Sequence, residues 1–375
     1  MFSFFTKKLI KYNFNGISSE SFKVMIRKKL KNKRIELMID LRSDTITKPT
    51  PNMLEAMFSA PVGDDVFEDD PSVNLLQDKA SELFNMQAAL FCPSGTMTNQ
   101  IAIRINTSPQ DEVICDQNAH IYLYEGGGMM LNSMVSPKLL TGDKGRLTAE
   151  MIAAAINPDD IHRPKTSLVA LENTMNKGGG AIYDFKEIIK IATVCKKNEL
   201  KLHMDGARLF NALAESQETP ADYGTLFDTI SICFSKGLGA PVGSMLIGTK
   251  DAINQAKRVR KAMGGGMRQA GYLAAACTYA LDHHLDKIKD DHRKAQTLAS
   301  AIENLSFVSA LYPVQTNIII IVLKPDRSPK TFLHQLEKKG LLAVGFGNGL
   351  IRLVTHLDFN DDQMEKVISI FRSLE

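Results

Sequence analysis

The sequence lacks the features of a membrane-spanning or secreted disulfide-rich protein. No apolar run in its 375 residues approaches the roughly 20 residues that a membrane-spanning helix needs. Its five cysteines are scattered, odd in number, and form neither a CxxC pair nor a zinc-ligand spacing. This pattern favours a reduced, cytoplasmic setting in which the cysteines serve as small core residues. No long apolar stretch precedes a small-residue cleavage site, which disfavours a secretory signal.

Acidic residues are scarce at the start of the chain. Residues 1–36 hold ten Lys or Arg and two Glu, a local charge of +8 within a total of +3, so the remainder carries −5 and shows no basic footprint for nucleic acid. The basic head fits a targeting segment, a membrane-surface helix or an upstream translation without function. Met38 follows directly and offers an alternative start, so we favour the third interpretation and expect residues 1–37 to be dispensable.

From Met38 onward, short apolar runs alternate with amphipathic segments, which predicts an α/β protein with a mostly parallel sheet. A short strand running into a turn is expected at 88–96, further strands at 112–115, 167–172, 200–205, 229–234 and 243–248, and helices at 73–84, 96–105 and 184–197. After a helical stretch at about 251–303, two further strands at 317–323 and 351–357 and two helices predict a smaller α+β unit. We expect a large domain at 38–284, with an N-terminal arm, and a small one at 285–375.

A lysine ends one of the apolar strands, in the stretch TISICFSKGLGAPVG at 229–243. Lys236 either reaches solvent or pairs with a carboxylate, the usual case, or is kept reactive by partial desolvation, which frees its amine to form a Schiff base. Asp205 ends another strand, in HMDGARLF, where open α/β sheets bind ligands; it could also simply cap the next helix. A lysine and an aspartate at one sheet edge suit pyridoxal phosphate (PLP), whose ring nitrogen an aspartate keeps protonated.

A phosphate needs a third group, and CPSGTMTNQ at 92–100 follows a strand and opens a helix. The backbone N–H groups of such a helix start, with the hydroxyls of Ser94 and Thr96, form an anion cradle. An SGT turn alone is weak evidence, since many helices begin this way. A strand followed by SGT at a helix start, then DGAR and then SKG further along the chain, is together a specific signal for a PLP site.

From Met38 to the C-terminus the chain resembles the L-threonine aldolases, in the β-eliminating lyase branch of the fold-type-I PLP enzymes. This resemblance implies a large, mostly parallel seven-stranded sheet domain and a smaller C-terminal domain. Eight motifs in order carry it: DLRSDTIT (40–47), GDDVFEDDP (63–71), CPSGTMTNQ (92–100), LENTMN (171–176), HMDGARLFNA (203–212), SKGLGAPVGS (235–244), GGGMRQAG (264–271) and IRLVTHLD (351–358).

The resemblance assigns the cofactor-binding residues one by one. Lys236 would bind PLP covalently, and Asp205 would pair with its ring nitrogen. His120 would stack on the ring, although such a histidine could also be a satisfied core or cap residue. Ser94, Gly95 and Thr96 would hold the phosphate, and Arg268 would reach the phosphate of a neighbouring subunit. The family's assembly implies a homo-oligomer, usually a tetramer of two catalytic dimers. No metal, nucleic acid or membrane partner is expected.

The resemblance also implies a substrate pocket. Arg352, with Ser43, is placed for the substrate carboxylate, which a guanidinium can bind in bidentate fashion; Arg352 could otherwise be a surface arginine at a strand end. Arg208 would lie near the ring and the substrate, and Tyr124, where some relatives have phenylalanine, would line the pocket. His120 and His162 are candidates for handling the proton of the β-hydroxyl; His162 could instead be an ordinary loop residue.

The chain departs from the family pattern at three further positions. Met175 stands where histidine is common, and Phe67-Glu68 where tyrosine-glycine is common. These changes put substrate specificity in more doubt than reaction type. We predict retro-aldol cleavage of L-threonine or L-allo-threonine to glycine and acetaldehyde. The alternatives are β-elimination or racemisation on the same fold, or a non-catalytic binding protein of this ancestry.

Overall fold

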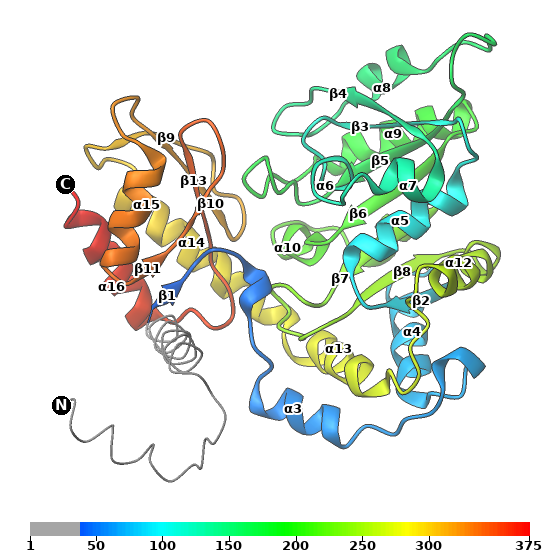
Figure 1. The fold of residues 1–375 in the computed structure, drawn as a ribbon, viewed down its shortest axis with the longest axis horizontal. Helices are drawn as coiled ribbons and strands as arrows, with labels where there is room; N and C mark the ends of the chain where they lie inside the picture. Colours follow the sequence, from blue (N-terminus) through cyan, green and yellow to red (C-terminus); the bar gives the residue numbers. More distant parts are fainter. Residues whose placement is uncertain (1–37) are drawn as a thin grey trace, which may run out of the picture.

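The computed structural model describes residues 38–375 as two lobes (Figure 1). The basic head, and with it the expectation that residues 1–37 are dispensable, lies outside the described residues. The larger lobe contains a seven-stranded sheet in the order β2-β8-β7-β6-β5-β3-β4. Only β8 runs antiparallel to its neighbours, so the predicted mostly parallel sheet is confirmed. Its strands are β2 (Ala88–Cys92), β3 (Glu112–Asp116), β4 (Ser136–Leu140), β5 (Thr166–Glu172), β6 (Lys201–Gly206), β7 (Thr229–Cys233) and β8 (Ser244–Gly248).

Helices cover both faces of this sheet because its central strands are apolar on both sides. In β5, Val169 and Leu171 face one core cluster while Leu168 and Ala170 face another. The first face packs against α4 (Pro71–Leu83), α8 (Ala149–Ala155), α9 (Phe185–Lys197) and α13 (Gly271–His283). The second packs against α5 (Gly95–Asn106), α7 (Gly128–Ser133) and α12 (Lys250–Ala262).

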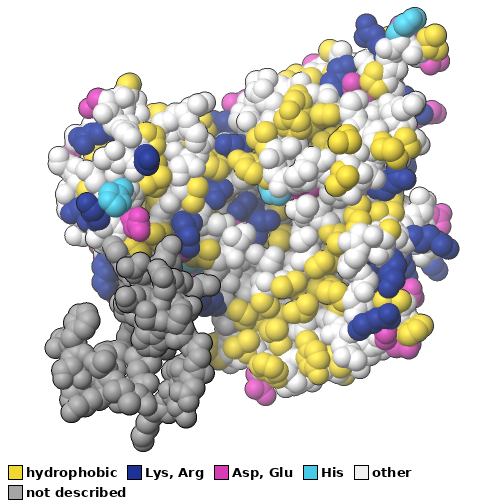
Figure 2. Space-filling model, in the orientation of Figure 1, with side chains coloured by type: hydrophobic (Ala, Val, Ile, Leu, Met, Phe, Trp, Pro, Cys, Tyr) yellow, Lys and Arg dark blue, Asp and Glu magenta, His cyan; other side chains and the backbone are white. Residues whose placement is uncertain are grey.

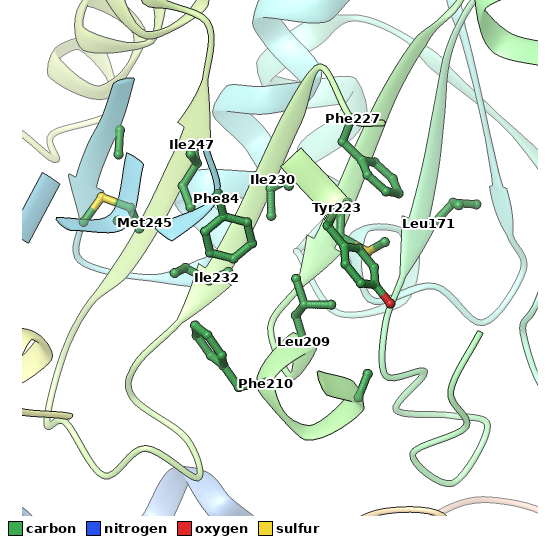
Figure 3. Packing of buried hydrophobic residues seen from close by; sticks show 14 of the residues in the cluster. Phe84, Leu171, Leu209, Phe210, Tyr223, Phe227, Ile230, Ile232, Met245 and Ile247 are labelled. Carbon is green, nitrogen blue, oxygen red and sulfur yellow. The ribbon is translucent and has the colours of Figure 1, made fainter. Parts of the chain in front are cut away.

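The main core lies on the first of these faces. Figure 3 shows Ile230 and Ile232 of β7 with Phe84 and Phe210 close by, and Tyr223 beside Phe227. The Tyr223 and Phe227 rings are stacked, with their centroids 6.3 Å apart. Burial of each such large side chain contributes roughly 1.5–3 kcal/mol to the stability of the fold.

The smaller lobe is built on a four-stranded antiparallel sheet in the order β12-β13-β10-β9. Its strands are β9 (Val308–Leu311), β10 (Ile318–Leu323), β12 (Val344–Gly345) and β13 (Leu350–Val354). The sheet packs on α14 (Ile288–Ile302), α15 (Pro329–Lys338) and α16 (Asp361–Arg372), around a core that includes Phe307, Phe332 and Phe371. This lobe confirms the prediction of a smaller α+β unit after the large sheet.

The start of the described chain belongs with the smaller lobe, whereas the sequence assigns residues 38–284 to the large domain. Strand β1 (Ile39–Asp40) pairs in parallel with β11 (Leu341–Leu342), and Leu41 lies in the core of the smaller lobe. The chain then crosses to the large lobe, where α3 (Pro51–Phe58) packs against α13. No helix within residues 38–375 has both the length and the apolar character needed to cross a membrane.

Candidate functional site

The candidate site lies where three parallel strands end, at the edge of the large sheet that faces the smaller lobe. Glu172 ends β5, and Asp205 lies beside it in register near the end of β6. Lys236 follows β7 by three residues. Figure 2 shows Lys, Arg and His side chains gathered in the hollow between the lobes. Parallel strands deliver their carboxyl ends to one edge, which is why residues distant in sequence converge here.

Asp205 is buried and held by two donors. Its Oδ2 accepts a hydrogen bond from Asn99 Nδ2 at 2.8 Å, and its Oδ1 accepts one from the Ala207 N–H at 3.1 Å. Asn99 lies on the inner face of α5, so the helix that follows the SGT turn also fixes the aspartate. A buried carboxylate held in this way suits a protonated ring nitrogen.

His120 begins α6 (His120–Leu123) and lies close to this aspartate. Its Nδ1 lies 2.9 Å from Oε1 of Glu125, whose side chain is fully buried. Burial lowers the pKa of His120, but the hydrogen bond to Glu125 and the charges of Asp205 and Glu172 outweigh it, so the pKa is raised. The ligating atoms of His120, Glu125 and Asp205 all lie within 4.8 Å of one another.

Glu172 connects two parts of the site. Its Oε2 accepts a hydrogen bond from the His120 N–H at 2.8 Å, and its Oε1 accepts one from the Asn176 N–H at 2.9 Å. Burial, followed by the charge of Asp205, raises the pKa of Glu172 to about 7. The carboxyl group therefore ties the start of α6 to the loop after β5.

Asn176 in turn holds Arg352 of the smaller lobe. Arg352 Nη1 donates to Asn176 Oδ1 at 2.8 Å, and Nη2 donates to the Arg42 carbonyl at 2.9 Å. The guanidinium lies over the ring of Phe346, 4.7 Å from its centroid. Desolvation, followed by the charge of Arg208, lowers the pKa of Arg352 to about 10. Its Nε is buried without a hydrogen-bond partner among the described residues, so this cation is prepared for an anionic ligand.

Arg208 is buried in a bidentate ion pair with Asp44. Its Nε and Nη2 donate to the two carboxylate oxygens of Asp44 at 2.8 and 2.7 Å. Desolvation would raise the pKa of Asp44, but Arg208 and Lys236 lower it to about 2. Asn317 of the smaller lobe also donates to Asp44, at 3.3 Å. Ser43 caps the short turn that carries this aspartate, accepting from the Thr45 N–H.

Lys236 occupies a half-buried position in the turn after β7. The hydroxyl of Thr47 donates to its carbonyl at 2.9 Å, which fixes the turn from the chain crossing between the lobes. The Lys236 charge also acts on Cys233, where burial raises the thiol pKa but Lys236 and the hydrogen bond to the Ser235 hydroxyl lower it below its usual value. The amine therefore lies at the sheet edge rather than on the outer surface.

The start of α5 supplies an anion cradle. Ser94 is the N-cap, and its hydroxyl accepts from the Met97 N–H at 3.2 Å. No acceptor within residues 38–375 is bonded to the N–H groups of Gly95 and Thr96. A side chain on Gly95 would approach the Ser244 hydroxyl, which is buried without a partner among these residues. Free N–H groups, a helix N-terminus and an unpaired hydroxyl fit a phosphate, so the residues present fit PLP.

Three of the predicted site residues lie at the margin of the site or away from it. Tyr124 is 47% exposed, with its ring 5.5 Å from that of His120. Arg268 is exposed and pairs with Asp64 at 2.9 Å. His162 lies on an exposed loop where its ring contacts Asp160 at 2.8 Å. The single chain does not bring His162 into the site, so any role there would require a second copy.

The positions that depart from the family pattern also lie apart from the charged groups. Phe67 is 71% exposed and Glu68 pairs with Lys257 on the surface. Met175 is fully buried, and a side chain on Gly145 would collide with it.

Sequence reasoning missed five site residues: Asp44, Asn99, Glu125, Glu172 and Asn176. Four of them lie inside the eight motifs, and Glu125 follows the predicted pocket residue Tyr124, but each acts through a partner that only the fold brings near. A buried polar residue on an otherwise apolar helix face, such as Asn99, is the signal that could have found one of them.

A large parallel sheet with a lysine, an aspartate and a helix N-terminus at one edge defines an α/β enzyme built to hold a phosphorylated, ring-containing cofactor. Comparison with known proteins gives the family. Residues 40–325 match the Beta-eliminating lyase model, and the chain belongs to this family. It is 39% identical to the low specificity L-threonine aldolase of Escherichia coli K12, over 90% of this chain and 99% of that protein.

A second relative and a solved structure are also similar to this chain. The low-specificity L-threonine aldolase of Eremothecium gossypii is 37% identical over 88% of this chain and 85% of that protein. The threonine aldolase structure from Leishmania major superimposes with a TM-score of 0.78 at 23% identity, covering 90% of this chain and 99% of that chain. At that identity the superposition supports the fold alone.

Proposed function

We propose that this protein is a PLP-dependent lyase that cleaves L-threonine and L-allo-threonine to glycine and acetaldehyde. One observation carries the proposal: Lys236, the buried Asp205 carboxylate and the α5 N-terminus share one sheet edge with two arginines for a carboxylate. The curated relatives named low-specificity L-threonine aldolase support the choice of substrate.

The site residues divide into those that hold the cofactor and those that hold the substrate. When bound, PLP supplies a sink for the electron pair released as the Cα–Cβ bond breaks. Lys236 would hold its aldehyde carbon, Asp205 its ring nitrogen, and Ser94, Gly95 and Thr96 its phosphate. The bidentate pair with Asp44 fixes the Arg208 guanidinium, and removing one partner of such a buried pair typically costs roughly 3–5 kcal/mol.

Substrate orientation falls to Arg352, with Ser43 and Arg208 near it. A carboxylate between these cations would replace the hydrogen bond that Arg352 Nε lacks among the described residues. Fixing the carboxylate would fix the orientation of the substrate at Cα, and so which of its bonds is placed to break. Tyr124 would bound the pocket on the side of the substrate side chain.

Proton handling at the β-hydroxyl falls to His120. The charges of Asp205, Glu172 and Glu125 raise the pKa of this imidazole and its Nδ1 is hydrogen-bonded to Glu125, so the ring can hold a proton at this position and return it. His162 would contribute only from a second copy of the chain. We propose a homo-oligomer, a tetramer of two catalytic dimers, in which Arg268 reaches a neighbour's phosphate. We also propose cytoplasmic threonine catabolism and glycine formation as its setting.

The test is product analysis with purified, PLP-loaded protein. L-Threonine and L-allo-threonine should each give equal amounts of glycine and acetaldehyde, and Lys236→Ala should abolish both the turnover and the visible absorbance of the bound cofactor. Pyruvate from serine or cysteine without acetaldehyde from threonine would favour β-elimination instead. Borohydride reduction that fixes the cofactor on another lysine would refute the assignment of Lys236.

A further inference from the structure

A continuous chain of polar side chains, all buried except the half-buried Asn106, runs behind Asp205 at the candidate site. Asn106 Nδ2 donates to Thr229 Oγ1 at 3.0 Å, and Thr229 Oγ1 lies 3.0 Å from His203 Nδ1. His203 Nε2 lies 3.1 Å from Asn99 Oδ1. The chain ends at two carboxylates, because Asn99 Nδ2 lies 2.8 Å from Asp205 Oδ2 and 2.9 Å from Glu125 Oε1.

The chemistry of the two carboxylates fixes which way the Asn99 amide points. Ionised carboxylates only accept hydrogen bonds, so the group between Asp205 and Glu125 must be the NH₂ donor. The amide oxygen then faces His203, whose Nε2 must carry the proton. Burial lowers the pKa of His203 to about 4, which keeps this ring neutral. With its only proton on Nε2, the Nδ1 of His203 accepts from the Thr229 hydroxyl.

This arrangement gives one amide group two tasks. Asp205 is the group for the cofactor ring nitrogen, and Glu125 is the partner of the ring-stacking His120. Both carboxylates are buried, and the Asn99 amide donates to both of them, which ties the position of one to that of the other. Gln100, the next residue of α5, donates to the other oxygen of Glu125 at 2.6 Å but not to Asp205.

We propose that Asn99 is a positioning residue that joins the ring-nitrogen carboxylate to the His120–Glu125 pair, and that His203 sets the orientation of its amide. The roles given to Asp205 and His120 rest on the proposed function, whereas the orientation of the Asn99 amide does not depend on it. Its consequence is that the edge and the face of the cofactor ring are held by one hydrogen-bonded unit anchored in β6, β7 and α5.

The amide orientation can be tested without cofactor or activity. In cofactor-free protein labelled with ¹⁵N-histidine, NMR should show His203 as a neutral ring with its proton on Nε2. Asn99→Ala removes the acceptor, so the proton should move to Nδ1, which faces the Thr229 carbonyl at 3.1 Å. A proton on Nδ1 in the wild-type protein would mean that the amide points the other way, and would overturn the proposal.

The link to the cofactor is tested by substitution at constant shape. Asn99→Asp replaces the donor between two carboxylates with an acceptor, and should weaken PLP binding by on the order of ten- to a hundredfold, as expected for losing hydrogen bonds to charged groups. PLP is titrated into each protein and followed by its visible absorbance.

Asn157→Asp is the matched control. Asn157 Nδ2 likewise donates to a buried carboxylate, Glu112 Oε1, at 3.0 Å, but at the opposite edge of the sheet. It should bind PLP as the wild type does, with both variants checked for folding by thermal melting. Wild-type PLP affinity in a folded Asn99→Asp protein would overturn the proposal, as would an equal loss in Asn157→Asp. If the wild-type protein itself binds no PLP, the proposed function fails while the NMR result for His203 still stands.

Discussion

At the residue scale, the most specific electrostatic feature is the guanidinium of Arg352. Its Nη1 donates a hydrogen bond to Asn176 and its Nη2 donates one to the Arg42 carbonyl, while its buried Nε has no partner among residues 38–375. A cation held in this way loses little freedom on binding a carboxylate. Lysine could replace the charge, but not the planar fork that reaches several acceptors at once.

Arg352→Lys should therefore raise KM for L-threonine on the order of ten- to a hundredfold, equivalent to about 1.5–3 kcal/mol for a charged hydrogen bond. The cofactor absorbance should persist, because the lysine, aspartate and phosphate cradle are untouched. Steady-state kinetics give the result, with Arg42→Lys as control: that side chain is exposed and pairs with Asp40, while its carbonyl remains. An unchanged KM in Arg352→Lys would show that the carboxylate is bound elsewhere.

At the element scale, the end of β5 is linked to the start of α6 and to the following loop by Glu172. Burial and the Asp205 charge raise its pKa to about 7 in the folded chain, whereas an unfolded glutamate titrates near about 4.3. Between these values the folded state binds more protons. The stabilisation from Glu172 is thus fully present below about pH 4.3 and is lost as pH rises through about 7.

Glu172→Gln removes this titration. In cofactor-free protein, the free energy of unfolding of the wild type relative to the variant should therefore decrease between about pH 4.3 and 7. Denaturant unfolding across this range measures the difference. Glu112→Gln, a buried carboxyl at the opposite end of the sheet, is the control for loss of a buried charge. A wild-type-minus-variant difference that stays constant with pH would contradict the assigned titration.

The elements differ in how far the sequence predicts them. Strands β5, β6 and β7 are short, almost entirely buried segments, and their predicted bounds differ from the observed ones by one residue or less. Strand β4 was missed because it is the sheet edge, half exposed and interrupted by Pro137. The two-residue β1 and β11 have no local signal, since their pairing joins positions about three hundred residues apart.

The site residues also differ in how far the sequence predicts them. Lys236, Asp205 and the SGT turn are predictable because each ends or begins an element, and the topology brings such ends to one edge. The roles of Asn99 and Glu125 are not, because a hydrogen bond between α5, β6 and the segment after α6 depends on side-chain packing that no local pattern encodes.

At the scale of the whole molecule, the candidate site is shared between the lobes. Arg352 and Asn317 come from the smaller lobe, and Lys236 and Asp205 from the larger. Asp44, on the segment that crosses between them, bonds to Arg208 of one lobe and Asn317 of the other. A change in the relative position of the lobes would therefore alter the substrate clamp before it altered the cofactor groups.

The largest-scale prediction concerns Arg268, which is exposed and pairs within residues 38–375 only with Asp64. A surface arginine that pairs this weakly contributes little to folding, so Arg268→Ala should reduce PLP retention more than thermal stability.

If Arg268 acts on a neighbour's cofactor, mixing Arg268→Ala chains with Lys236→Ala chains should restore activity. In a hybrid dimer, one site then combines an intact Lys236 with the other chain's intact Arg268, while the second site carries both lesions. The experiment co-expresses the two chains with different affinity tags, purifies the doubly tagged hybrid, and compares its turnover of L-threonine with that of each parent. An inactive hybrid would place the action of Arg268 within its own chain, and would remove the reason for requiring a second subunit at the site.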